Sequence, residues 1–271
     1  MSISSLTRRR IKIFRIRNQR LKMRLRQHLF PTRLFQIVFS IFWLTALSPL
    51  FLTIAILIKI VLPGPVFYRG ARVGVGSTIF KVIKFRTLPE RYESRVGGRL
   101  LSAKERYNGR LAAILIRFKL DELPQLINVL RGDMALVGPR PVRPIFFSKY
   151  GKEITGYAKR FQVKPGVTGL AQIVGGYYMD PKDKLRYDLL YIQHKCMALD
   201  IKIIILTIVT LFLGRNIMKH RFIEKFLNMS LKVNGSDISP SKEIYKKITN
   251  HDDPEHGLQN VNVNETKQRG H

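Results

Sequence analysis

An apolar run at positions 34–62 limits what this chain can fold into more than any other feature of the sequence. About 20 apolar residues suffice for a helix to span a bilayer, so the run is long enough to enter a membrane. It is longer than the apolar part of a secretory signal, and no small-residue cleavage site follows it. Ser48 and Pro49 lie near its middle, and a proline inside a helix removes one backbone hydrogen bond and bends the axis. We therefore expect a bent membrane helix with Ser48 and Pro49 as its hinge.

Basic residues flank this run on both sides. Residues 1–33 contain 11 Lys and Arg and no acidic residue, and the residues after the run include Arg69, Arg72, Lys81, Lys84 and Arg86. Because basic residues prefer the cytoplasmic side of a membrane, two basic flanks predict a re-entrant hairpin that enters and leaves through one face. One kinked helix that crosses the bilayer is the alternative, since spanning helices tolerate proline.

The composition excludes several classes of protein. The chain has 271 residues, of which 45% are hydrophobic, so it is not mainly disordered, and its one cysteine, Cys196, excludes an intrachain disulfide framework. A formal net charge of +30 suits nucleic acid or anionic lipid, and the apolar run favours membrane lipids and no nucleic acid partner. We divide the chain into a basic arm (1–33), a membrane segment (34–62), one domain (63–227) and a polar, disordered tail (228–271).

Strand-like alternation follows the membrane segment. Residues 66–73 and 78–86 flank the turn sequence Gly74-Val75-Gly76-Ser77, which predicts a β-hairpin. The glycines fit neither common nucleotide-binding loop, so we interpret them as turn residues. Lys84 and Arg86 alternate with apolar neighbours and share one face of the second strand. That face is either a plain solvated surface or part of a site for an anion.

Two adjacent carboxylates stand out in the stretch 117–141. Pro124 suits the first turn of a helix, which places Asp121 and Glu122 at the positive end of that helix. They are either simple partners of the helix dipole or a site in which one ionised carboxylate acts as a nucleophile or Mg²⁺ ligand. After the helix, Pro139 and Arg140 belong to a rigid Gly-Pro-Arg-Pro turn, which suits a guanidinium aimed at a phosphate.

Four motifs together carry a resemblance to a known family. They occur in the family's order: GPVFYR to KFRT at 64–87, LDELPQL at 120–126, GDMALVGPRP at 132–141 and PGVTGLAQI at 165–173. Over about residues 34–213 the chain resembles the bacterial sugar transferases, the monotopic polyprenyl-phosphate phosphoglycosyl transferases.

The resemblance implies an activity and roles for individual residues. The reaction would transfer a sugar-1-phosphate from a UDP-sugar to undecaprenyl phosphate and release UMP, as the first membrane step of polysaccharide or glycoconjugate synthesis. Asp121 would be the nucleophile and would bind Mg²⁺, and Glu122 would complete an acidic dyad. The residues expected to bind substrate phosphate are Lys84, Arg86, Pro139 and Arg140. The enzyme would act on the cytoplasmic face of a bacterial inner membrane, and no particular sugar or oligomeric state is implied.

The resemblance also implies a fold class. We expect an α+β, predominantly helical protein: a re-entrant membrane hairpin plus a cytosolic catalytic domain with a small β-hairpin and interfacial amphipathic helices. A second apolar run at 203–213 is too short to span a bilayer, so it lies at the interface or in the core. Asp188 and Asp200 match acidic positions common in the family, as structural hydrogen-bonding groups or as substrate contacts.

The chain departs from the family pattern in several places. Ile116 and Lys119 stand where an arginine and a serine or threonine are common, and Leu88 replaces a common methionine. Residues 175–178 lack the arginine often found there. Two alternatives therefore stay open: a membrane-anchored basic binding protein without chemistry, and a transferase without a covalent intermediate. The binding protein would tolerate Asp121→Asn, and the second transferase would form no sugar-phosphate adduct.

Overall fold

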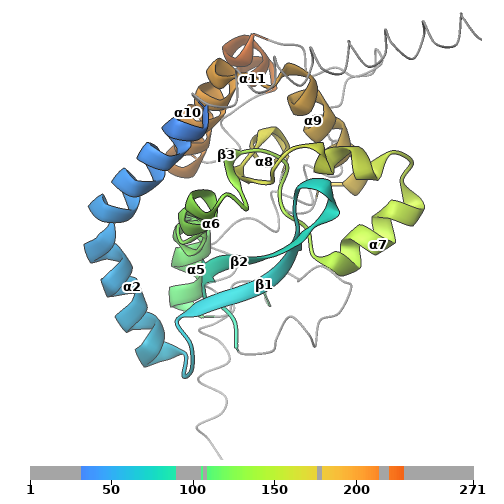
Figure 1. Cartoon of the computed structure of the whole chain (residues 1–271). Coiled ribbons are helices and arrows are strands. Elements are labelled where there is room, and N and C mark those ends of the chain that lie inside the picture. The colour runs from blue at the N-terminus through green and yellow to red at the C-terminus, as the bar shows by residue number, and fades with distance from the viewer. Residues whose placement is uncertain (1–31, 90–104, 106–108, 176–178, 214–219, 229–271) are drawn as a thin grey trace, which may run out of the picture.

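The computed structural model describes residues 32–89, 105, 109–175, 179–213 and 220–228. Most of the predicted basic arm, nearly all of the predicted tail and residues 176–178 lie outside this part of the chain. The described part is mostly helical with two small sheets (Figure 1). The predicted fold class, α+β and predominantly helical, is confirmed at this level.

The apolar run forms two helices, Thr32–Ala46 and α2 (Ser48–Val61), whose axes differ by 61°. The break falls at Leu47, directly before the predicted hinge. Pro49 is the second residue of α2, and because it has no N–H it cannot bond to the carbonyl four residues earlier. Among the described residues no single helix is long and apolar enough to cross a membrane, whereas this bent pair together has sufficient length and composition.

The bent pair packs against the remainder of the protein along one side (Figure 1). In α2, Ile54 and Ile58 are buried in a cluster with Phe85 and Leu115, while its outward face exposes apolar side chains, among them Leu52, Ile56 and Ile60. In the preceding helix, Arg33 donates to the carbonyls of Val129 and Leu130. Arg33 therefore caps the end of a helix in the domain, although the sequence assigned it to the basic arm.

The predicted β-hairpin is present. Strands β1 (Phe67–Val73) and β2 (Ile79–Phe85) pair antiparallel, with Tyr68 opposite Lys84 and Val73 opposite Ile79. The connection contains Gly76 and Ser77, both with a φ of 63°. This left-handed backbone produces the tight reversal that the glycine-rich sequence predicted.

A second, parallel sheet pairs β3 (Ala135–Val137) with β4 (Gly166–Thr168), and the sequence did not predict it. The two strands touch so closely that a Cβ at Gly166 would lie 2.1 Å from the Gly138 nitrogen. The Gly138 N–H donates to Thr168 at 2.9 Å, and the Gly166 N–H donates to Pro139 at 3.0 Å. Glycine at position 166 therefore permits the contact that fixes the Pro139-Arg140 turn.

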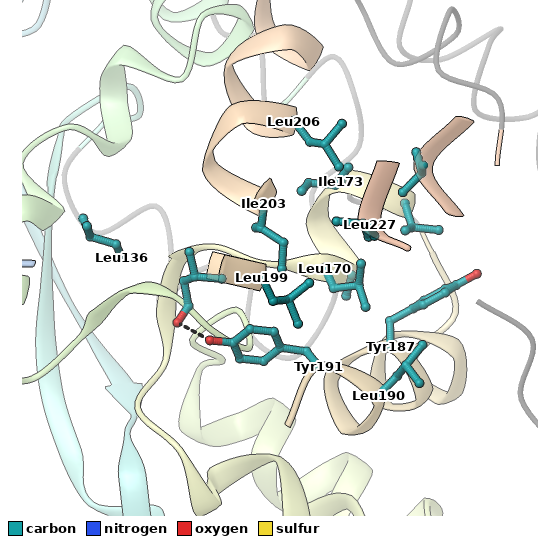
Figure 2. Close-up of a cluster of buried hydrophobic side chains, with 14 of the residues drawn as sticks. Leu136, Leu170, Ile173, Tyr187, Leu190, Tyr191, Leu199, Ile203, Leu206 and Leu227 are labelled. Atoms are coloured by element: carbon teal, nitrogen blue, oxygen red, sulfur yellow. Dashed lines mark hydrogen bonds between the residues drawn. The ribbon is translucent and has the colours of Figure 1, made fainter. Parts of the chain in front are cut away.

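Among the described residues, the largest apolar cluster extends from β2 and β3 to the C-terminal helices (Figure 2). These are α8 (Leu170–Val174), α9 (Pro181–His194), α10 (Met197–Leu213) and α11 (His220–Leu227). The apolar run 203–213 is the second part of α10. It buries Ile203 and Leu206 in this cluster and exposes Ile205, Ile208 and Phe212 on its other side.

The remaining helical elements are α5 (Arg110–Arg117), α6 (Gln125–Arg131), α7 (Pro144–Glu153) and the 3₁₀ turns η1 (Val75–Ser77), η2 (Leu120–Glu122) and η3 (Tyr157–Gln162).

Asp200 gives a pH-dependent prediction for stability. The Tyr191 hydroxyl lies 2.8 Å from Asp200 Oδ1 and 3.1 Å from the Val137 carbonyl, but it has one hydrogen to donate. A protonated Asp200 donates to Tyr191 and leaves that hydrogen for Val137. Burial raises the pKa of Asp200 to about 6, although the Tyr191 hydrogen bond and Lys195 act in the opposite direction.

The folded-state pKa of Asp200 lies above its ordinary value, so its stabilising contribution is present at low pH and is lost as the pH rises through about 6. Asp200→Asn keeps a neutral donor beside Tyr191 at all pH values. We expect it to raise the free energy of unfolding at pH 8 by up to about 3 kcal/mol, from two pKa units at roughly 1.4 kcal/mol each. Denaturant unfolding in detergent at pH 8 and pH 4.5 checks this; an equal gain or a loss at both pH values would contradict it.

Candidate active site

The two adjacent carboxylates lie in η2, the turn that joins α5 to α6. Lys119 has a left-handed backbone, with φ 57° and ψ 19°, and reverses the chain directly before Asp121. Pro124 immediately precedes α6, so the dyad lies one short turn ahead of the helix rather than in its first turn. Both carboxylates are buried, with Asp121 8% and Glu122 6% exposed. Burial of two ionised acids without charge partners would cost much free energy, so the neighbouring groups determine whether each carboxylate is ionised.

Glu122 is held by two cations. Lys84 Nζ lies 2.7 Å from its Oε1, and Arg140 Nη2 lies 2.6 Å from the same oxygen. Arg140 Nη1 also donates to Oε2 at 3.3 Å. Burial alone would raise the pKa of Glu122, but the charges of Arg140, Lys84 and Lys119 outweigh burial and hold the pKa well below its ordinary value. Glu122 is therefore ionised and fixed in place.

Asp121 differs from its neighbour because its Oδ1 is buried without a hydrogen-bond partner. Burial raises the pKa of Asp121, and the negative charge of Glu122 raises it further, whereas Lys84, Lys119 and Arg140 lower it. An unpaired carboxylate oxygen keeps its lone pairs available. Asp121 is thus equipped to attack an electrophile or to bind a cation, while Glu122 is already occupied.

Arg140 reaches the dyad from the turn after β3. Its Nη1 donates to Gln172 Oε1 at 2.7 Å, so the guanidinium is shared between Gln172 and Glu122. Pro139 contributes through its carbonyl, which accepts the Gly166 N–H and anchors the turn. Sequence reasoning did not single out Gln172, although it lies within the motif PGVTGLAQI.

Arg86 does not join this cluster. Its guanidinium donates to the carbonyls of Leu62 and Pro63, which directly follow α2, and its side chain is buried. The sequence placed Lys84 and Arg86 together as candidates for phosphate binding. The structure brings only Lys84 to the dyad, whereas the hydrogen bonds of Arg86 join the end of the apolar run to β2.

Asn128 is a second residue that sequence reasoning missed. Its Oδ1 accepts the Ile83 N–H at 2.9 Å, and its Nδ2 donates to the Lys81 carbonyl at 2.9 Å. These bonds attach α6 to the strand that carries Lys84. Asn128 therefore fixes the distance between Lys84 and the dyad, but no periodicity in the sequence distinguishes it from a surface asparagine.

The other residues noted in the sequence surround the site. Ile116 is buried in α5, and Lys119 contributes positive charge that lowers the pKa of both dyad carboxylates. Asp188 forms an ion pair with Arg160, and Asp200 bonds to Tyr191. Neither of these two aspartates contacts the dyad through a described hydrogen bond or ion pair.

The donor set of the site bears on metal binding. In the described part of the chain, no group of three or more His, Cys, Asp or Glu side chains could hold a metal ion. Mg²⁺, however, is commonly bound by one or two carboxylates together with substrate phosphates. The unpaired Oδ1 of Asp121 fits that arrangement, whereas the oxygens of Glu122 are taken by Lys84 and Arg140.

Comparison with known proteins gives the same family as the four sequence motifs. Residues 27–214 match the family described as bacterial sugar transferase. A UDP-N-acetylgalactosamine-undecaprenyl-phosphate N-acetylgalactosaminephosphotransferase of Aeromonas hydrophila is 39% identical over 62% of this chain and 40% of the relative. A UDP-glucose:undecaprenyl-phosphate glucose-1-phosphate transferase of Xanthomonas campestris pv. campestris is 39% identical over 64% of this chain and 37% of the relative. The uncharacterized sugar transferase EpsL of Bacillus subtilis is 34% identical over 72% of this chain and 94% of its own length. The chain thus spans about two fifths of the first two relatives.

Proposed function

Because the chain belongs to the bacterial sugar transferase family, we propose that it transfers a sugar-1-phosphate from a UDP-sugar to undecaprenyl phosphate and releases UMP. Relatives with 39% identity carry names that state this class of reaction. The observation that carries the proposal is the difference between the two carboxylates of the dyad. Glu122 is bound by two cations, whereas the adjacent Asp121 has an unpaired oxygen.

The proposed reaction proceeds in two displacements at phosphorus. An Asp121 oxygen forms a bond to the sugar-proximal phosphorus, and the bond from that phosphorus to the bridging oxygen breaks, so UMP leaves with the electron pair. A phosphate oxygen of undecaprenyl phosphate then attacks the same phosphorus, and the carboxylate of Asp121 departs. The products are the undecaprenyl-diphosphate sugar and the unmodified enzyme, so ping-pong kinetics are expected.

Lys84 and Arg140 are proposed to stabilise the charge that develops on the phosphate oxygens. Both already lie at the dyad, held by Glu122, so little reorganisation is required when the substrate binds. The planar guanidinium of Arg140 suits bidentate recognition of a phosphate. Glu122 is proposed to keep these two cations in position rather than to attack.

Asp121 is proposed to hold Mg²⁺ through its unpaired Oδ1, and the ion would reduce the repulsion between an anionic nucleophile and an anionic donor. The cytoplasmic face of the bacterial inner membrane is the proposed location, because one substrate is a soluble nucleotide and the other a membrane lipid. Exposed apolar side chains on α2 and α10 supply a surface compatible with lipid.

The function is tested by incubating the detergent-purified protein with Mg²⁺, undecaprenyl phosphate and a panel of UDP-sugars. UMP release that requires the lipid acceptor for sustained turnover supports the proposal and identifies the donor. Failure to release UMP from any donor in the panel, with a bacterial relative of known activity as the positive control, would contradict it.

The membrane segment is proposed to be re-entrant, with Ser48 and Pro49 at the turning point. The 61° bend at Leu47 supports this proposal. We expect single cysteines introduced by Gln27→Cys and Arg69→Cys, in a Cys196→Ser background, to react with a membrane-impermeant maleimide only after the inner membrane is permeabilised. Labelling of one position but not the other in intact spheroplasts would contradict the re-entrant topology and favour a spanning helix.

A further inference from the structure

Arg160 is a buried cation that the proposed reaction does not use. It lies in η3 with 4% of its surface exposed, and it has partners in three separate segments. Its Nη2 lies 2.7 Å from Asp188 Oδ2 on α9 and also donates to the main-chain carbonyl of Arg140 at 3.0 Å. Its Nη1 donates to the Tyr157 hydroxyl at 2.7 Å. One guanidinium thus connects η3, α9 and the turn that carries Arg140.

The contact with Arg140 goes to the main chain and not to the side chain. The Arg140 side chain is thereby left to bind Glu122 and Gln172, while its backbone is held from the opposite direction. A further anchor of this turn is the hydrogen bond from the Gly166 N–H to the Pro139 carbonyl. Two anchors on consecutive residues define the direction in which Arg140 leaves the backbone.

We propose that the Arg160–Asp188 ion pair is a positioning device that aims Arg140 at the substrate diphosphate. The inference rests on the proposed function, since it takes Arg140 as the group that binds the donor phosphates. Asp188 neutralises and orients Arg160, Arg160 fixes the Arg140 carbonyl, and Arg140 contacts the substrate. Neither member of the pair is itself a catalytic residue.

A purely stabilising role explains the pair less well. Removing a charge from water is expensive, and replacing a buried ion pair with apolar side chains of similar volume often leaves stability unchanged or improved. What an apolar pair cannot supply is a fixed donor to the Arg140 carbonyl. A misplacement of about 1 Å at a reacting group can reduce the rate by about 10²-fold, so a fixed donor has value for function even where it has none for stability.

Stability and activity measured on the same variants distinguish a positioning role of the ion pair from a stabilising one. The double variant Arg160→Met/Asp188→Leu removes both charges, and we expect its thermal unfolding midpoint in detergent to lie near that of the wild type. We expect kcat/KM for the UDP-sugar to fall by about 10²-fold and the affinity for UDP, measured by titration calorimetry, to fall in parallel. The single variant Arg160→Lys keeps the charge beside Asp188 but not the planar fork, and a loss of about tenfold is expected.

Two controls separate positioning from structure. Arg186 and Asp183 form another ion pair on α9, in which Arg186 is exposed and Asp183 is half-buried. Arg186→Gln/Asp183→Asn should leave kcat/KM within about twofold. In an Arg140→Met background, the Arg160→Met/Asp188→Leu change should cause little further loss, because the residue that it positions is already absent.

The inference would be overturned by either of two results. One is wild-type kcat/KM and UDP affinity in the double variant or, if that variant does not fold, in Arg160→Lys. The other is an equal loss in the presence and absence of Arg140. Lack of UMP release by the wild type would contradict the proposed function instead, and in that case weakened UDP binding in the variants still supports the positioning of Arg140.

Discussion

Replacing Asp121 with asparagine is expected to reduce UMP release by at least about 10³-fold. The amide keeps the size and polarity of the side chain, so the neighbouring Glu122 should retain its contacts with Lys84 and Arg140. An amide, however, lacks the charge and the nucleophilicity of a carboxylate, so the first displacement should fail. Steady-state UMP release with saturating donor and acceptor measures the effect. Glu153→Gln, on the exposed face of α7, serves as the control and should remain within about twofold of the wild type.

Retention of more than a tenth of the activity by Asp121→Asn would remove Asp121 from its proposed role. A transferase that joins donor and acceptor directly, without an enzyme-bound intermediate, would then be the better explanation. The expected loss of UMP release in Asp121→Asn would also exclude a basic binding protein without chemistry, because such a protein tolerates a neutral isostere at this position.

Arg140→Met is expected to reduce kcat/KM for the UDP-sugar by about 10² to 10³-fold, the range found when one preorganised donor to a developing oxyanion is removed. The loss should include a higher KM, because Arg140 is proposed to contact the donor before as well as during the reaction. Arg140→Lys keeps the charge but cannot bind Glu122 and Gln172 together as the guanidinium does, so an intermediate loss is expected.

The control for Arg140 is Arg131→Gln, which removes an exposed basic residue at the far end of α6. It should change kcat/KM by less than about twofold, which would show that general loss of positive charge is not responsible. An unchanged KM and kcat in Arg140→Met would mean that the donor phosphates bind elsewhere, and Arg160 and Asp188 would then have no substrate-binding residue to position.

Features that depend on local sequence could be predicted. The bend in the apolar run follows from Pro49 having no N–H to donate. The β-hairpin follows from alternation around a turn that needs a left-handed backbone at Gly76 and Ser77. The family motifs directed attention to Asp121, Glu122, Lys84 and Arg140, and the structure places all four in one cluster.

Features that depend on contacts between distant segments could not be predicted. The strands β3 and β4 have three residues each, too short to show a pattern, and they pair because Gly166 lets two backbones meet. Lys84 and Arg86 are two residues apart in the sequence, and yet Arg86 donates to the Leu62 and Pro63 carbonyls, directly after α2, instead of joining the dyad. Arg160 and Asp188 come from separate elements, and their pairing is a property of the tertiary fold.

The central claim, that Asp121 carries the sugar phosphate between donor and acceptor, is tested most directly by mass spectrometry of the protein itself. Wild-type protein mixed with its UDP-sugar and Mg²⁺, without acceptor, should gain the mass of one sugar phosphate on the peptide that contains Asp121. It should release one UMP per enzyme and lose the added mass when undecaprenyl phosphate is supplied. Sustained transfer to the lipid without any adduct in rapidly quenched samples, or an adduct on another residue, would contradict the account.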